Sequence, residues 1–117
     1  MIGFTGNRRI MLYSQPVDFR RGIDGLAAQV QLTLKVNPFS GDIYVFRSKR
    51  ANCVKLLTWD GGGMVLATKR LEEGRFVWPP VRDGSVQLTS AQMSMLFEGL
   101  DWTRTAPKTV KRPLRAA

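Results

Sequence analysis

Basic side chains are interleaved with apolar and aromatic ones between Ile43 and Pro79, and between Ile43 and Leu71 the only acid is Asp60. The guanidinium of arginine donates two parallel hydrogen bonds to a phosphate, and lysine adds a compact charge. We therefore predict a basic β-ribbon that contacts a polyanion. Its cations are Arg47, Lys49, Arg50, Lys55, Lys69, Arg70 and Arg75. The alternative is that these cations only solvate one face of a sheet.

A second basic site is predicted where Asp18-Phe19-Arg20-Arg21-Gly22 leads into a helix. Paired arginines near a helix start can hold a phosphate together with unpaired backbone N–H groups. An ordinary capped helix start with exposed Arg20 and Arg21 explains the same residues equally well.

The last residues, 103–117, form a basic segment without acids and with two prolines, which predicts a flexible tail. Its cations are Arg104, Lys108, Lys111, Arg112 and Arg115. Such a tail adds sequence-independent affinity for DNA that salt weakens. The alternative is a solubilising end without a partner.

Three aromatic residues of the ribbon, Tyr44, Phe46 and Trp59, would stack on unpaired bases if they faced outward. Buried aromatic side chains dominate small hydrophobic cores, so we expect them to be core residues instead.

Acidic and nucleophilic residues do not predict catalysis. The chain has no histidine, the commonest general base and metal ligand. Five of the aspartates have a simpler interpretation as helix caps or turn formers. These are Asp18, Asp24, Asp42, Asp60 and Asp101. Cys53, the only cysteine, falls in a predicted strand and is expected to be an inert thiol. We therefore expect no enzyme, no metal and no cofactor.

The charge balance favours a nucleic-acid partner. Eighteen Lys and Arg oppose nine Asp and Glu, which gives a net charge of +9 and a pI near 10.6. A pI above about 9 is typical of nucleic-acid-binding domains. No signal peptide and no apolar run of membrane-spanning length is recognisable, so we expect a cytoplasmic protein.

The hydrophobic pattern predicts one α+β domain over residues 1–102, with residues 1–9 loose. Strands are expected at 10–13, 43–48, 53–59 and 64–69, with further extended pieces at 75–78 and 86–88. Asp18 or Asp24 is expected to cap a first helix, and Thr89 with Gln92 forms a capping box that opens a second. We expect an antiparallel sheet of four to five strands with both helices on one face.

Several short motifs resemble one family, the TnpB-type accessory proteins of the insertion sequence 66 family, which are distinct from the RNA-guided nuclease of the same name. The motifs are Val17-Asp18-Phe19-Arg20-Arg21-Gly22-Ile23-Asp24-Gly25-Leu26, Asn37-Pro38-Phe39-Ser40-Gly41, Val45-Phe46-Arg47, Trp59-Asp60-Gly61, Lys69-Arg70-Leu71-Glu72 and Gly74-Arg75-Phe76-Val77-Trp78-Pro79. The likeness covers roughly residues 8–102 in order.

This resemblance implies a helper in bacterial DNA transposition that is encoded beside a larger transposase, and it brings no catalytic residues with it. Together with the charge, it predicts a non-catalytic accessory protein that binds DNA, at the ends of its element, through the basic ribbon. The alternative is an adaptor that binds the transposase without contacting DNA. An exposed edge strand would also allow copies of the chain to pair.

Overall fold

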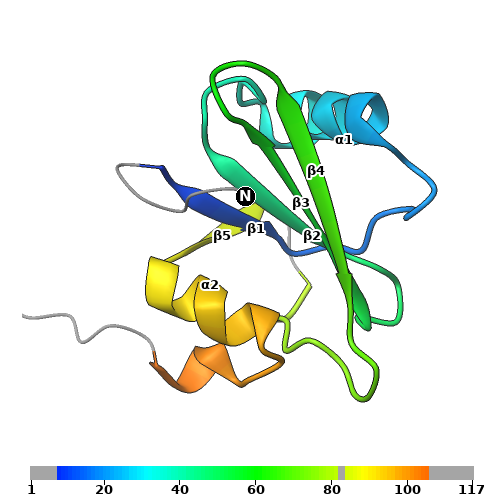
Figure 1. The fold of residues 1–117 in the computed structure, drawn as a ribbon, viewed down its shortest axis with the longest axis vertical. Helices are drawn as coiled ribbons and strands as arrows, with labels where there is room; N and C mark the ends of the chain where they lie inside the picture. Colours follow the sequence, from blue (N-terminus) through cyan, green and yellow to red (C-terminus); the bar gives the residue numbers. More distant parts are fainter. Residues whose placement is uncertain (1–7, 82–83, 106–117) are drawn as a thin grey trace, which may run out of the picture.

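The computed structural model describes residues 8–81 and 84–105, with nine regular elements in that part of the chain (Figure 1). The strands are β1 (Ile10–Tyr13), β2 (Ile43–Arg47), β3 (Cys53–Trp59), β4 (Met64–Arg70) and β5 (Ser85–Leu88). The helices are α1 (Ile23–Gln29), which continues as the π-helical turn η1 (Val30–Leu34), then α2 (Ser90–Phe97) and the 3₁₀ helix η2 (Trp102–Thr105). The prediction of a single α+β domain is confirmed.

The sheet has five strands in the order β4-β3-β2-β1-β5. All its pairs are antiparallel except that of β1 with β2, where Ile10 lies opposite Ile43 in a parallel register. The predicted antiparallel sheet is therefore confirmed for the other pairs and does not hold at this one. The connection explains this pairing. The chain returns through α1 and η1 to the end of the sheet where β1 began, and such a crossover makes the two strands parallel.

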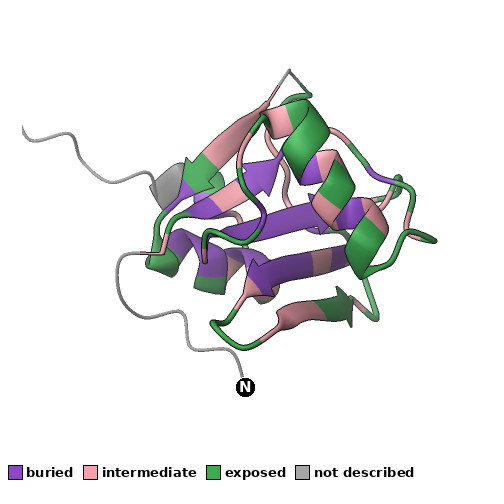
Figure 2. Ribbon diagram, turned by 90° about the horizontal axis from the view of Figure 1, so that it is seen from above, coloured by how far each residue is buried: buried purple, intermediate pink, exposed green. Residues whose placement is uncertain are grey.

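The two helices cover opposite faces of the sheet, as Figures 1 and 2 show, so the prediction that both lie on one face is wrong. Ile43 and Val45 of β2 pack in the cluster that contains residues of α2. Tyr44 and Phe46, which point the other way, pack in the cluster that contains Leu26 of α1. Because both faces of β2 are apolar and buried, each face needs its own cover.

The two helices begin differently. The capping box of α2 is confirmed, since Gln92 N donates to Thr89 Oγ1 at 3.1 Å and Thr89 N donates to Gln92 Oε1 at 2.9 Å. Helix α1 begins after Gly22, whose side chain offers no cap, so neither Asp18 nor Asp24 caps it. Asp18 is instead engaged by Arg20, which is described below.

The ends of the domain are ordered further than the sequence predicts. Arg9, expected in a loose segment, accepts a hydrogen bond from Ile43 N through its carbonyl at 2.8 Å. At the other end, residues 103–105 belong to η2, and the rest of the predicted basic tail lies outside the described residues. No helix in the described ranges is both long enough and apolar enough to cross a membrane.

Candidate nucleic-acid interface

Backbone hydrogen bonds bring three separate segments together at one end of the sheet. Val17 N donates to Arg47 O at 3.1 Å, which joins the segment before α1 to the end of β2. Leu71 N donates to Asn52 O at 2.9 Å, and Phe76 N donates to Ala51 O at 2.7 Å. The β2–β3 turn therefore lies between the segment before α1 and the segment after β4. We call residues 17–21, 47–52 and 70–76 the turn end; it lies along the right-hand side of Figure 1.

The turn end contains most of the cations that the sequence predicted for phosphate binding. Those within it are Arg20, Arg21, Arg47, Lys49, Arg50, Arg70 and Arg75. Lys49 and residues 16–19 line a common surface depression of about 470 Å³, which places this lysine directly beside the segment that carries the paired arginines. The predicted ribbon is thus a cluster at the end of three strands rather than a stripe along their faces.

Lys55 lies on β3 and holds the segment before α1 in place. Its Nζ donates to Phe19 O at 2.6 Å and to Arg21 O at 3.0 Å, and it lies 4.7 Å from the centroid of the Phe19 ring. The ammonium is therefore committed to internal carbonyls and an aromatic face. Lys55 therefore positions the segment that carries Arg20 and Arg21, and its contact with a polyanion stays a prediction.

Arg47 is half-buried at the end of β2 and shapes the turn that follows it. Its Nη1 donates to the carbonyls of Ser48 at 3.4 Å and Lys49 at 3.2 Å. Its Nε is buried and has no hydrogen-bond partner among the described residues. Burial lowers the pKa of this guanidinium. These contacts hold the carbonyl side of the turn and leave the side chains of Lys49 and Arg50 exposed.

Arg20 is exposed, but its charge is offset by Asp18. The guanidinium of Arg20 donates through Nε at 3.0 Å and through Nη2 at 2.8 Å to the two oxygens of that carboxylate. These side-chain hydrogen bonds, helped by the backbone N–H of Arg20, lower the pKa of Asp18 from 3.8 to about 2. Asp18 therefore stays ionised at neutral pH, and the pair contributes little net charge to the turn end.

Besides Arg20 and Arg21, four cations of the turn end are exposed: Lys49, Arg50, Arg70 and Arg75. The ion pairs in the described part of the chain join Arg9 to Asp42 and Arg20 to Asp18, so they involve none of these four. Arg21 is also exposed, and its Nη1 donates to Gln29 Oε1 at 2.5 Å. Unpaired cations of this kind are the groups from which phosphates displace only water and counterions.

Lys69 lies apart from this cluster. It points to the α2 side of the sheet, where its Nζ donates to the carbonyl of Phe97. Arg70, the next residue, points to the other side because successive side chains of a strand alternate. The predicted ribbon is therefore divided between two faces at β4.

The geometry favours neither the stacking of aromatic side chains on bases nor a metal site among the described residues. Tyr44 and Phe46 are fully buried, as expected of core residues, while half-buried Trp59 packs edge-on against Phe39 with ring centroids 5.7 Å apart. Within the described ranges, no three His, Cys, Asp or Glu side chains come together in a way that could hold a metal. Cys53 is a half-buried free thiol in β3.

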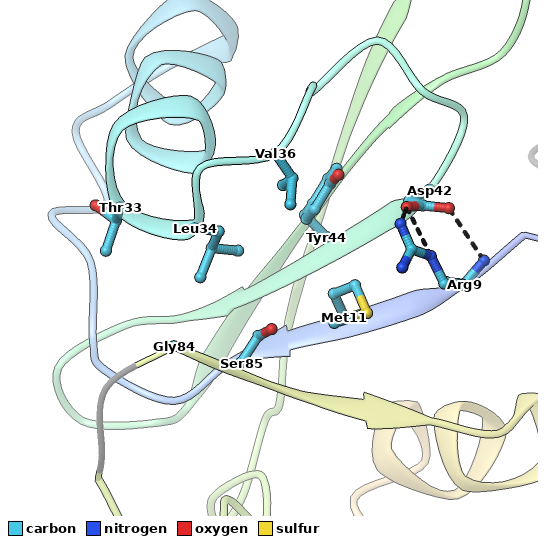
Figure 3. Close-up of a pocket in the computed structure, with 9 residues that line it drawn as sticks. All are labelled: Arg9, Met11, Thr33, Leu34, Val36, Asp42, Tyr44, Gly84 and Ser85. Carbon is cyan, nitrogen blue, oxygen red and sulfur yellow. Dashed lines mark hydrogen bonds and ion pairs between the residues drawn. The ribbon is translucent and has the colours of Figure 1, made fainter.

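At the opposite end of the sheet lies a polar feature that the sequence analysis missed. Arg9 Nε and Nη2 donate to Asp42 Oδ2 at 3.1 and 2.7 Å, beside a cavity of about 180 Å³ (Figure 3). Thr33, Leu34 and Val36 also line this cavity. Arg9 and Asp42 are 33 positions apart, so no local sequence pattern predicts their contact. The parallel pairing of β1 with β2 brings them together.

Comparison with known proteins identifies one matching family and two similar chains. Residues 8–107 match the family described as IS66 Orf2 like protein (TnpB_IS66). The chain is 50% identical over 117 residues to the uncharacterized protein y4jC of Sinorhizobium fredii, with all of both chains covered. It is 39% identical over 109 residues to the uncharacterized protein y4hO of the same organism, with 93% of each chain covered. No solved structure matches it significantly.

Proposed function

Because the chain belongs to the IS66 Orf2-like family, whose members are associated with transposition, we propose that it is an accessory protein that binds DNA through the turn end. The observation that carries this proposal is the group of exposed cations Lys49, Arg50, Arg70 and Arg75, on two segments that backbone hydrogen bonds hold together. Its role is to hold DNA of the mobile element while a separate transposase performs the chemistry.

The mechanism of binding follows from the arrangement of these cations. Arg47 is engaged internally and fixes the β2–β3 turn that carries Lys49 and Arg50. Hydrogen bonds from Leu71 N and Phe76 N join the segment that carries the other two to this turn. The exposed cations then meet phosphates without reorganising the backbone, which avoids the entropic penalty of ordering a loop. Binding of this type is driven by counterion release and reads little sequence.

A direct test is fluorescence anisotropy of a labelled duplex, taken from an end of an insertion sequence of this family, titrated with the full chain. We expect Arg50→Glu to weaken binding at least fivefold. Lys35→Glu is the matched control, because it makes the same charge change at an exposed residue beside the cavity at the opposite end of the sheet. It should weaken binding less than twofold.

Two results would oppose the proposal. Equal losses in Arg50→Glu and Lys35→Glu would mean that net charge, rather than the turn end, attracts DNA. The absence of binding by the unaltered chain would favour the other candidate, an adaptor that contacts only the transposase.

A further inference from the structure

Strand β4 forms an unpaired edge of the sheet. It is the last strand in the order β4-β3-β2-β1-β5, and within the described ranges no other strand pairs with its outer side. Figure 2 shows it at the margin of the sheet, with its last residues exposed. Its pairing with β3 runs without interruption from Met64 to Arg70, so it has neither bulge nor proline. Bulges and prolines, which block the addition of any strand, are missing from β4, while the charges of Lys69 and Arg70 oppose the addition of a basic strand.

A shallow apolar depression runs beside this edge on the α2 side. It has a volume of about 260 Å³ and is lined by Ala67, Thr68, Lys69 and Phe97. The hydrogen bond from Lys69 Nζ to the carbonyl of Phe97 closes one side of it. A strand added to β4 would direct every second side chain toward this depression.

The C-terminal end of this edge is also positively charged on both faces. Lys69 and Arg70 point to opposite sides of the sheet, and their cross-strand neighbours on β3 are Val54 and Cys53 rather than acids. The ammonium of Lys69 has three donors, of which one is used at Phe97, so it retains capacity for a carboxylate. Opposite charges on adjacent strands are stabilising and like charges are destabilising.

These observations distinguish between occupants. A second copy of the chain would place Lys69 and Arg70 against an equally basic partner that carries a net charge of +9. An acidic extended segment would meet cations on both of its faces. We propose that the outer edge of β4 binds a partner protein by accepting an acidic extended segment as a sixth strand, with an apolar side chain in the depression beside Phe97.

The test uses a fluorescein-labelled peptide of ten residues that repeats Glu-Glu-Val, so that both faces of the extended peptide carry Glu and Val. It is titrated with the full chain and followed by anisotropy. We expect saturable binding below millimolar concentration, and none with the peptide in which Lys replaces Glu. Lys69→Glu and Arg70→Glu should each weaken binding at least tenfold, and Lys35→Glu less than twofold. Urea unfolding of each variant identifies any that fails to fold, and either β4 variant alone is sufficient.

Amide hydrogen exchange distinguishes strand addition from simple charge attraction. Saturating peptide should slow exchange of the β4 amides at least tenfold and leave those of β1 unchanged. Four results would overturn the proposal: no binding of the acidic peptide, binding without protection of β4, dimers of the chain that Lys69→Glu dissociates, or displacement of the peptide from β4 by duplex DNA that itself protects β4.

Discussion

The Lys55 ammonium joins β3 to the segment that leads into α1. A lysine in a basic stretch is expected to face solvent, yet this one donates to two carbonyls from residues 34 and 36 positions away. Sequence spacing gave no sign of this contact, because it depends on α1 packing on the face of the sheet to which Lys55 points. The general rule that follows is that a cation with internal acceptors supports a binding surface without belonging to it.

Replacing Lys55 with Met keeps the aliphatic stem and removes the donor. We expect Lys55→Met to lower the free energy of unfolding by about 1–2 kcal/mol, because two carbonyls lose a charged hydrogen-bond partner. Urea unfolding measures this change. Lys49→Met, at an exposed residue of the same end, should change stability by less than about 0.5 kcal/mol. Equal effects of the two variants would contradict the role assigned to Lys55.

The Asp18 carboxyl should titrate far below its usual range. Arg20 lowers the pKa of Asp18 to about 2, so its contribution to folding is complete above the ordinary value of 3.8 and is lost as the pH falls through about 2. Carbon-13 NMR titration of the side chain should show this midpoint in the native chain. In Arg20→Gln the midpoint should rise toward the ordinary value, and an unchanged midpoint would contradict the pairing.

At the scale of elements, local signals predicted well and long-range ones did not. The capping box of Thr89 and Gln92 lies within four residues, and it is present as predicted. The strand expected at 43–48 is also present, as β2 from Ile43 to Arg47. The side on which each helix packs, and the parallel pairing of β1 with β2, depend on chain crossovers that no local pattern encodes.

Removing the cap of α2 tests the local part of this account. Thr89→Ala deletes the hydroxyl that accepts from Gln92 N, and we expect a loss of about 1 kcal/mol in the free energy of unfolding. Thermal or urea unfolding measures it. Ser90→Ala, one residue later at an exposed position, is the control and should have a much smaller effect. DNA binding at the turn end should be unaffected by either change, since α2 covers the other face of the sheet from α1.

At the scale of the whole molecule, the described cations differ in their surroundings. Most of the exposed ones lie at the turn end, while Arg9 and Lys35 are exposed near the opposite end of the sheet. Lys55 and Arg47 are used internally, and Lys69 lies on the α2 side of an open edge. The sequence showed which residues are basic and that Asp60 is the only acid between Ile43 and Leu71, whereas the turn end also contains Asp18, Glu72 and Glu73. It did not predict this division, because the division follows from which backbone carbonyls and which faces the folded chain places beside each side chain.

The salt dependence of DNA binding by single-charge variants tests the central claim most directly. The logarithm of the association constant should fall linearly with the logarithm of salt concentration, and each lost phosphate contact should reduce the slope by about 1. We expect that reduction in Lys49→Gln and in Arg50→Gln, and no change of slope in Lys35→Gln. Identical slopes in all three variants and the native chain would contradict the assignment of the turn end as the DNA-binding surface.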